Sequence, residues 1–441
     1  MNEIRIAEPL MSAMTSRLFE AADLETCAVG FLQRGHEGVS LMSGFEKAAD
    51  DAYVERTSVA AVLQPEYVAA AVAKARAESA GLVFLHTHPN DLQRPSFSRF
   101  DDAGERRLAT YVEHKLPHSN HAAMVISPGG VTARGLGKGG TIEVRQVGKK
   151  LVRLSAFGPH ADPLDQFDRQ IRAFGLHGQA RLAALRVGVV GLGGTGSLTV
   201  QQLAYLGISH FTLIDFDTVE QTNLNRLVGA TPKDVGVTKL EVAKRAVMAI
   251  NPDAVVEGMQ GDVVDDGVSN ALTACDIIVL CTDSHASRAI VSQIGYQYLI
   301  PVIDMGVVIS VRNDEVAFIN GRVQLMAPGL PCLHCMDWLD SEKIRVEMMT
   351  PEARAADPYV TGVGVPQPAV ISLNGVVSSL AVTMLIGVVT DAPFDARLQI
   401  YDAKAGTVRP AVAEVDPNCL ICSFHGALAR GQSMSLPTRR A

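Results

Sequence analysis

The sequence predicts an α/β protein in which a mostly parallel sheet forms the larger C-terminal part and a smaller α+β unit precedes it. The length of 441 residues is more than one ordinary core requires, so at least two domains are expected. From Arg186 the chain reads as an apolar strand, a glycine loop, a helix and a second strand, in RVGVVGLGGTGS, LTVQQLAYLG and HFTLIDFD. This order is a βαβ unit, which requires parallel strands.

The N-terminal part is expected to contain a helix near Ala7–Ala21, a strand at Thr26–Leu32, a helix at Glu66–Ala77 and a strand at Leu82–His86. After it, the segment LVRLSAFGPHADP mixes glycine, proline and short polar residues, which favours a linker over residues 148–164. We therefore expect domains at 1–147 and 165–430, followed by a disordered tail at 431–441.

Further strands of the larger part are expected at Asp276–Cys281 and Val302–Met305. The most apolar segment, Val376–Val389, is shorter than the roughly 20 residues that cross a bilayer, so it predicts a buried helix. The net charge of −8 gives no reason to expect a nucleic acid or an anionic membrane as partner. The first ten residues, MNEIRIAEPL, lack the pattern of a secretory signal, and a cytoplasmic protein is expected.

A glycine loop directly follows the first strand of the larger part and opens a helix, with Gly191, Gly193, Gly194 and Gly196. Glycines in this context let backbone amides and the helix N-terminus approach phosphate groups closely. Asp215 ends the next strand about 20 positions later, where an acidic residue typically meets ribose hydroxyls. These residues alone fit a dinucleotide dehydrogenase equally well.

The residues after that strand separate the two possibilities. Asp215-Phe-Asp217 is followed by Asn223 and Arg226 in TNLNR, by Lys239 in GVTK and by Asp283 in CTDSHASR. This series resembles the ThiF/MoeB family, the adenylating domain shared with ubiquitin-activating enzymes, and the likeness runs from Phe167 to about Phe424. The resemblance implies a Rossmann-like, mostly parallel sheet that binds ATP and Mg²⁺.

Attack of a carboxylate on an α-phosphate builds up negative charge, and Arg226 and Lys239 are the cations expected to stabilise it. By resemblance, Asp283 holds magnesium, whereas Asp215 and Asn223 hold the ribose. Arg169 would reach the phosphates from a partner subunit, so a homodimer is implied. Asp217 is a further candidate for the nucleotide site, although an Asp that leaves a strand is often only a turn or cap residue.

Two CxxC pairs, Cys332/Cys335 and Cys419/Cys422, have the spacing of a tetrahedral four-cysteine zinc site. Four cysteines fill all positions around the metal and leave none for a catalytic water, so this zinc is expected to be structural. The same zinc knuckles occur in the ThiF/MoeB family. His334 lies inside one knuckle and is expected to be a bystander.

A second candidate zinc site lies in the N-terminal part, where His86-Thr-His88-Pro is followed by Ser98-Arg-Phe-Asp101. Two histidines at alternate positions leaving a strand point the same way, and a carboxylate completes three ligands with an open position for water. Glu25, at the start of an earlier strand, is the candidate base. The set resembles the JAMM (JAB/MPN) metalloprotease family over roughly residues 5–140, in which Ser98 would steady the tetrahedral intermediate.

Many relatives of ubiquitin-activating enzymes carry a nucleophilic cysteine shortly before the final apolar helix. The corresponding stretch here, residues 359–368, holds no cysteine, and outside the two CxxC pairs only Cys27, Cys275 and Cys281 remain. We expect these three to be buried core residues. The acyl-adenylate would then pass directly to an acceptor or carrier, or a hydroxyl such as Thr361 would take it as an oxyester.

The sequence therefore predicts a bifunctional enzyme of a prokaryotic ubiquitin-like pathway. Its larger domain would adenylate the C-terminal carboxylate of a ubiquitin-like protein, with a carrier (conjugating) enzyme as a further partner. Its JAMM domain would process that protein or remove it from conjugates. One alternative is activation of a sulfur-carrier protein for cofactor or natural-product synthesis. The other is an adaptor that binds a ubiquitin-like protein without turnover.

Overall fold

The structure is a computed structural model that describes residues 1–439 apart from 22, 156–164, 314, 358–359 and 361–367. Its contacts divide the chain into two compact units. The first unit comprises Met1–Phe157, Gln297–Leu299 and Ala427–Ser435, and the second comprises Gly158–Tyr296, Ile300–Gly426 and Leu436–Ala441. Each unit has a sheet of eight strands.

The first unit is built on a mixed sheet with the strand order β1-β3-β2-β6-β7-β8-β9-β10, in which β1 also pairs with β9. Its strands are β1 Glu3–Ala7, β2 Cys27–Arg34, β3 Val39–Lys47, β6 Gly81–Thr87, β7 His121–Ser127, β8 Gly130–Gly135, β9 Gly139–Val147 and β10 Leu151–Arg153. A separate hairpin consists of β4 Tyr53–Arg56 and β5 Ala61–Leu63. The helices are α1 Glu8–Leu18, α2 Pro65–Ala77 and α3 Arg99–Lys115, with a 3-10 turn at Asp50–Ala52.

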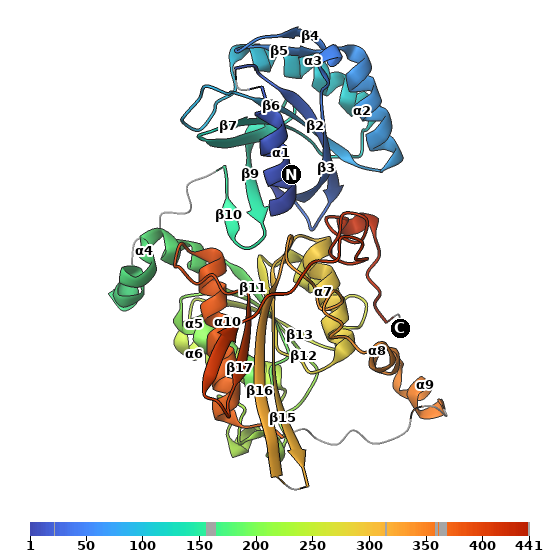
Figure 1. Cartoon of the computed structure of the whole chain (residues 1–441). Helices are drawn as coiled ribbons and strands as arrows, with labels where there is room; N and C mark the ends of the chain where they lie inside the picture. Colours follow the sequence, from blue (N-terminus) through green and yellow to red (C-terminus); the bar gives the residue numbers. More distant parts are fainter. Residues whose placement is uncertain (22, 156–164, 314, 358–359, 361–367, 440–441) are drawn as a thin grey trace. The chain divides into compact units, whose positions relative to one another are not determined.

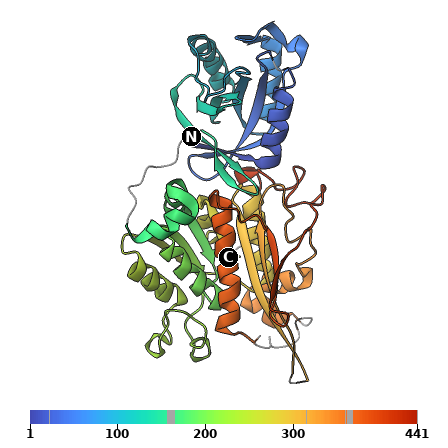
Figure 2. The same ribbon diagram turned by 60° about the vertical axis from the view of Figure 1, so that its left-hand side comes forward.

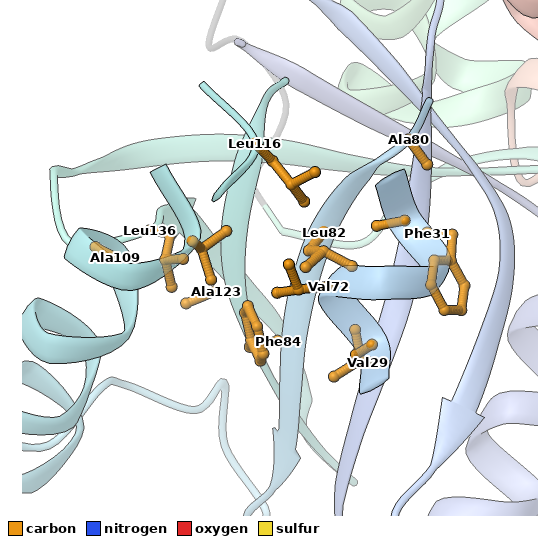
Figure 3. Packing of buried hydrophobic residues seen from close by; sticks show 13 residues of the cluster. Val29, Phe31, Val72, Ala80, Leu82, Phe84, Ala109, Leu116, Ala123 and Leu136 are labelled. Atoms are coloured by element: carbon orange, nitrogen blue, oxygen red, sulfur yellow. The ribbon is translucent and has the colours of Figure 1, made fainter. Parts of the chain in front are cut away.

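The core of the first unit explains how its candidate metal ligands come together. Leu82 and Phe84 of β6 belong to the hydrophobic cluster that α2 and α3 complete with Val72 and Ala109 (Figure 3). Side chains alternate between the two faces of a strand, so His86, two residues beyond Phe84, points to the same face. The packing of α3 on that face therefore brings the beginning of α3 to the end of β6.

The second unit has the strand order β13-β12-β11-β14-β15-β16-β17-β18, in which the first five strands are parallel and the remaining pairs are antiparallel. The parallel strands are β11 Arg186–Val190, β12 His210–Asp215, β13 Val255–Gln260, β14 Ile277–Leu280 and β15 Val302–Arg312. The antiparallel extension consists of β16 Glu315–Met326, β17 Leu398–Asp402 and β18 Thr407–Pro410.

Helices cover both faces of this second sheet. The helices of the second unit are α4 Asp168–Ala183, α5 Gly194–Tyr205, α6 Lys239–Ile250, α7 His285–Gln297, α8 Ser341–Glu347, α9 Pro351–Ala356 and α10 Ile371–Val389, with 3-10 turns at Asp165–Phe167, Gln221–Asn223, Pro232–Asp234 and Ser269–Ala274. A further 3-10 turn, Gly431–Ser433, belongs to the first unit. Helices α5, α6 and α10 lie on one face and α7 lies on the other (Figures 1 and 2). This two-sided cover is typical of parallel sheets.

The parallel βαβ arrangement predicted from Arg186 onward is confirmed. The expected apolar helix is also present, but α10 runs to 19 residues and is long and apolar enough, by length and composition alone, to cross a membrane. Half of its most apolar window is buried, against α5, β15 and β16, as expected for a core helix. The antiparallel half of the sheet was not predicted.

Two expected boundaries differ from the structure. Leu151–Arg153 forms β10 beside β9, so the start of the expected linker belongs to the first sheet. The C-terminal stretch, expected to be a disordered tail, is held by specific contacts. Gln297 Nε2 donates to Gly431 O at 2.8 Å, and Arg439 Nε pairs with Asp265 Oδ1 at 2.7 Å.

Candidate functional site

The candidate nucleotide site lies at the carboxyl edge of the parallel strands of the second unit. Gly191 directly follows β11, Asp215 ends β12 and Asp283 lies just beyond β14. These strands are neighbours in the sheet, so their carboxyl ends meet at one edge, next to the start of α5 at Gly194. Ligands of open parallel sheets bind at this edge.

Glycine is required at two positions of the loop. Gly191 adopts φ of +86°, a conformation that side chains disfavour, and a Cβ atom on Gly196 would lie 1.9 Å from Gly191 O. A Cβ atom on Gly193 would meet nothing within 4 Å, so open space borders the loop there. The loop can therefore approach phosphates, and the amides at the start of α5 are the groups that would bind them.

Asp215 is only 8% exposed, and both of its carboxylate oxygens accept backbone hydrogen bonds. Oδ2 accepts from Leu192 N at 2.6 Å and Oδ1 accepts from Asp217 N at 2.8 Å. Burial raises the pKa of Asp215, and the two hydrogen bonds oppose that rise. Asp215 therefore fixes the glycine loop against the end of β12, in addition to the ribose role that the resemblance implies.

The two candidate cations, Lys239 and Arg226, reach this edge from different elements. Lys239 Nζ, at the start of α6, donates to Asp217 Oδ2 at 2.6 Å. Arg226 Nη1 donates to Thr222 O at 2.8 Å, and a Cβ atom on Gly194 would lie 3.3 Å from the Arg226 side chain. Arg226 thus lies along the beginning of α5, and Asp217 holds Lys239 in place.

The other three predicted residues of this site differ in their settings. Asn223 is buried, and its Oδ1 accepts from Glu220 N at 3.2 Å, so it shapes the turn that carries Arg226. Asp283 is exposed beyond β14, as a metal ligand for a bound nucleotide has to be. Arg169 is exposed near the start of α4, and among the described residues no hydrogen bond joins it to the nucleotide edge. Thr361 lies outside the described residues.

The four cysteines of the two CxxC pairs form one cluster in the second unit. Their Sγ atoms lie 3.6 Å apart for Cys332 and Cys335, 3.5 Å for Cys332 and Cys419, and 3.3 Å for Cys335 and Cys422. Four thiolates at about 2.3 Å around a tetrahedral zinc lie roughly 3.8 Å apart. All four sulfurs fall within 4.8 Å of one another, so the cluster fits a zinc ion.

Of the three remaining cysteines, Cys27 and Cys275 are core residues as expected, whereas Cys281 is partly exposed. Cys27 is 5% exposed and Cys275 is fully buried. Burial raises the pKa of Cys27 to about 12 and that of Cys281 to about 12, so both thiols are protonated at neutral pH. A protonated thiol is a poor nucleophile.

In the first unit His86, His88 and Asp101 form a second cluster, with one ligand atom of each within 4.8 Å of the others. His86 Nε2 lies 3.3 Å from Asp101 Oδ1 and is buried without a hydrogen-bond partner among the described residues. Burial favours a raised pKa for Asp101, but His86 and hydrogen bonds from Ser98 lower that pKa overall. An ionised carboxylate beside two imidazoles is a donor set that fits zinc.

Glu25 is buried beside this cluster, where its Oε1 is 3.7 Å from His88 Nε2. Burial raises the pKa of Glu25, and His86 and His88 partly offset that rise. The backbone of Glu25 is fixed from two directions. Glu25 N donates to Thr57 O at 2.8 Å, and Arg56 Nε donates to Glu25 O at 3.0 Å.

Ser98 is the N-cap of α3. Its N–H donates to Asp101 Oδ2 at 2.6 Å, and its Oγ accepts from Asp101 N at 3.2 Å, which together make a capping box. The cap fixes Asp101 with one oxygen toward His86. The Ser98 hydroxyl proton takes no part in the capping box, so the hydroxyl can still donate to another acceptor.

Residues 167–421 match the sequence profile of the ThiF family. The chain belongs to the ThiF family. The "SAMP-activating enzyme E1" of Haloferax volcanii is 29% identical over 275 residues, which cover 60% of this chain and 91% of that relative. The "Molybdopterin-synthase adenylyltransferase" of Salmonella typhimurium is 29% identical over 261 residues, covering 58% of this chain and 95% of that relative.

Among solved structures, Escherichia coli MccB with succinimide is 21% identical and has a TM-score of 0.47. The match covers 60% of this chain and 77% of that chain. The ThiF match begins at the turn before α4 and ends between the two cysteines of the second CxxC pair. It includes the nucleotide edge, whereas the cluster of His86, His88 and Asp101 lies outside it.

Sequence reasoning missed the residues that support the site. Asp91 Oδ2 lies 3.2 Å from His88 Nδ1. Thr57 of the β4–β5 hairpin accepts a hydrogen bond from the backbone of Glu25. In the ThiF part, Asp304, Arg322 and Trp338 form a cluster close to α7. The one available signal was that Trp338 is the single tryptophan of the chain.

Proposed function

We propose that the second unit uses ATP to adenylate the C-terminal carboxylate of a ubiquitin-like or sulfur-carrier protein. The observation that carries this proposal is the joint placement of the glycine loop, Arg226, the Lys239–Asp217 pair and Asp283 at one edge of a ThiF-family sheet. The names of the two relatives, an activating enzyme and an adenylyltransferase, support the same reaction class.

In this reaction a carboxylate oxygen attacks the α-phosphorus of ATP, the bond to the bridging oxygen breaks and pyrophosphate leaves. The amides at the start of α5 bind phosphate oxygens, while Arg226 and Lys239 stabilise the negative charge that builds up. Magnesium held by Asp283 would supply further positive charge to the phosphates. Binding the two reactants side by side removes most of the entropic barrier.

The acyl-adenylate would leave this chain without an enzyme-bound thioester. Four of the seven cysteines form the zinc-type cluster, and Cys27 and Cys281 have thiols with raised pKa. The seventh, Cys275, is fully buried. We propose direct transfer of the acyl group to an acceptor or a carrier enzyme.

For the first unit we propose a zinc-dependent peptidase or isopeptidase activity of the JAMM type, directed at the same protein tail. The cluster of His86, His88 and Asp101, with Glu25 beside it, supports this assignment. Zinc bound by these three residues would supply an acidified water at its open position. Glu25 would take the proton of that water, and Ser98 would donate to the developing oxyanion.

Together the two units would cut and activate one tail, as in a prokaryotic ubiquitin-like pathway. Sulfur-carrier activation for cofactor or natural-product synthesis uses the same two sites and differs in the acceptor. An adaptor without turnover would not need Arg226, Lys239 and Asp283 at one edge, so the arrangement favours an enzyme.

Exchange of radioactive pyrophosphate into ATP tests the adenylation proposal, with candidate ubiquitin-like and sulfur-carrier proteins added to the full chain. Exchange should depend on the added protein and be lost in Asp283→Ala. Asp253→Asn is the matched control, because Asp253 is exposed in the loop before β13, at the opposite edge of the sheet. No exchange with any added protein, or exchange that Asp283→Ala leaves intact, would overturn the proposal.

The proposed homodimer has a separate test, since Arg169 of one subunit would complete the site of the other. Arg169→Ala and Asp283→Ala should each lack exchange activity, and mixing them should restore part of it, because a mixed dimer contains one intact site. Continued inactivity of a mixture whose subunits demonstrably exchange would argue against shared sites.

A further inference from the structure

A buried ion cluster lies next to the nucleotide edge of the second unit. Asp304, on β15, is fully buried, and each of its two carboxylate oxygens accepts a hydrogen bond from one guanidinium group. Arg288 Nε on α7 donates to Oδ1 at 3.1 Å, and Arg322 Nη2 on β16 donates to Oδ2. Both arginine side chains keep a partly open edge, with 15% and 18% of their surfaces exposed.

Trp338 forms one wall of this cluster. Its ring lies 4.0 Å from the Arg322 guanidinium, a distance at which the ring face attracts a cation. Trp338 follows the knuckle of Cys332 and Cys335 by three residues, and Gln324 Nε2 donates to Pro331 O at 2.9 Å just before that knuckle. The four-cysteine cluster therefore holds the tryptophan against the arginine.

The cluster has one positive charge more than its own carboxylate can balance. Two guanidinium groups share Asp304, and among the described residues no second carboxylate lies within 4.0 Å of either group. Burial lowers the pKa of Arg322, the Asp304 carboxylate opposes that fall, and the neighbouring Arg288 adds to it. Arg288 Nη1 makes no hydrogen bond to another described residue. An incoming anion would satisfy both the charge and the free donors.

The position of the cluster indicates which anion that is. Asp304 pairs in the sheet with Leu280, the last residue of β14, and Asp283 follows three residues later. Arg288 lies in the first turns of α7, which begins two residues after Asp283. The free donors therefore lie near the carboxyl edge, on the α7 face of the sheet, and Arg288 follows Asp283, the residue proposed to hold magnesium, by five residues.

We propose that Arg288 and Arg322, anchored by Asp304 and walled by Trp338, bind the carboxylate of an extended peptide tail before it is adenylated. This inference rests on the proposed adenylation. The guanidinium groups hold one carboxylate oxygen while the other attacks the α-phosphorus, the bond to pyrophosphate breaks, and no proton is transferred. Formation of the acyl-adenylate removes the negative charge and with it the attraction to the arginines.

Trp338 provides the readout, because it is the single tryptophan of the chain. N-acetylglycine, the smallest peptide-like molecule with a free carboxylate, is titrated into the full chain with and without ATP while Trp338 emission is followed. N-acetylglycinamide, which lacks the charge, is titrated in parallel at constant ionic strength. We expect a saturable emission change with the acid and at least a tenfold weaker response to the amide. Equal responses, or no response to the acid in either state, would overturn the proposal.

Charge-conserving variants test the two arginines while limiting damage to the fold. Arg322→Lys and Arg288→Lys keep the ion pair with Asp304 possible but remove the forked donors. Each should weaken acid binding about tenfold, as measured by Trp338 emission, and raise the KM for the protein tail more than that for ATP. Arg312→Lys, at the exposed end of β15, is the matched control and should leave both unchanged.

The emission titration uses no turnover, so its outcome is independent of the exchange assay. Acid-specific binding without any exchange would refute the adenylation and leave a carboxylate site, whereas exchange without acid-specific binding would refute only the present inference. A loss of ATP affinity equal to the loss of tail affinity in Arg288→Lys would show that the arginine serves the nucleotide instead.

Discussion

The two metal-type clusters of this chain differ in how completely they surround their centre. The four-cysteine cluster of the second unit supplies four ligands from two distant pairs, and three of its cysteines are buried. The cluster of His86, His88 and Asp101 supplies three ligands, all partly exposed, and Glu25 lies beside His88. The first is closed and joins chain segments, whereas the second leaves room for a water.

This contrast shows how a structural metal site can be distinguished from a catalytic one by the number and burial of its protein ligands. The closed cluster connects the segment after β16 with the segment after β18, so we propose that its zinc stabilises the fold. The open cluster lies at a strand end that the core of the first unit already fixes, so we expect the first unit to fold without a metal there. The following experiments test that division.

Removal of one cysteine should have the largest effect. Cys419→Ser should lose about one zinc per chain and unfold the second unit, because a structural zinc site contributes on the order of 10 kcal/mol, comparable with the stability of a whole domain. His86→Ala should also lose about one zinc but keep its melting temperature within a few degrees. Metal analysis and calorimetry measure the zinc content and the melting temperature of the two variants. Equal destabilisation of both variants would contradict the proposed division into a structural and a catalytic site.

Substitution of the base should separate metal binding from chemistry within the open cluster. Glu25→Gln should retain zinc and lose about 10²- to 10⁴-fold in the rate of cleavage of a ubiquitin-like conjugate, because no group remains to take the proton of the water. Cleavage assays with metal analysis of the same sample provide the measurement. Unchanged cleavage would identify another base.

A smaller effect is expected from Asp91, which contacts His88 through Nδ1 at 3.2 Å. Asp91→Asn should weaken zinc binding by about 10- to 100-fold, since the partner of a ligating histidine sets its orientation and basicity. Competition with a chelator of known affinity measures this change. Glu37→Gln, an exposed acid in a loop of the same unit, should have no effect.

The smallest effect concerns the cap of α3. Ser98→Ala should cost about 1 kcal/mol of stability through loss of an N-cap and should also weaken zinc binding, because Asp101 loses its fixed orientation. Thr238→Ala removes the comparable N-cap of α6 and should cost about as much without any change in zinc content. If both variants retain zinc equally, the cap serves only the helix.

Much of the site could be predicted from sequence because its signals are local. The glycine loop follows an apolar strand, and the HxH pair alternates along one, so strand periodicity alone sets their directions. The spacing within the two CxxC pairs also predicted one four-cysteine site, and the family resemblance supported that prediction. The structure places all four sulfurs together.

Other features had no local signal. The antiparallel strands β16 to β18 depend on pairing across more than 70 residues between β16 and β17, which periodicity cannot specify. Asp304 looks like an ordinary strand residue, and only the fold brings Arg288 and Arg322 to it from two other elements. The polar composition of the last eleven residues suggested disorder, yet Arg439 finds two acidic partners in Asp262 and Asp265.

The assignment of Ala427–Ser435 to the first unit has a consequence for synthesis on the ribosome. Residues up to Phe157 emerge early, but Gly431, which Gln297 binds, follows some 270 residues later. At about 5–20 residues per second, that interval is roughly 15–50 s. The first unit therefore waits for nearly the whole chain before its last segment can dock, so a nascent chain that stops early exposes the surface meant for that segment to chaperones and proteases.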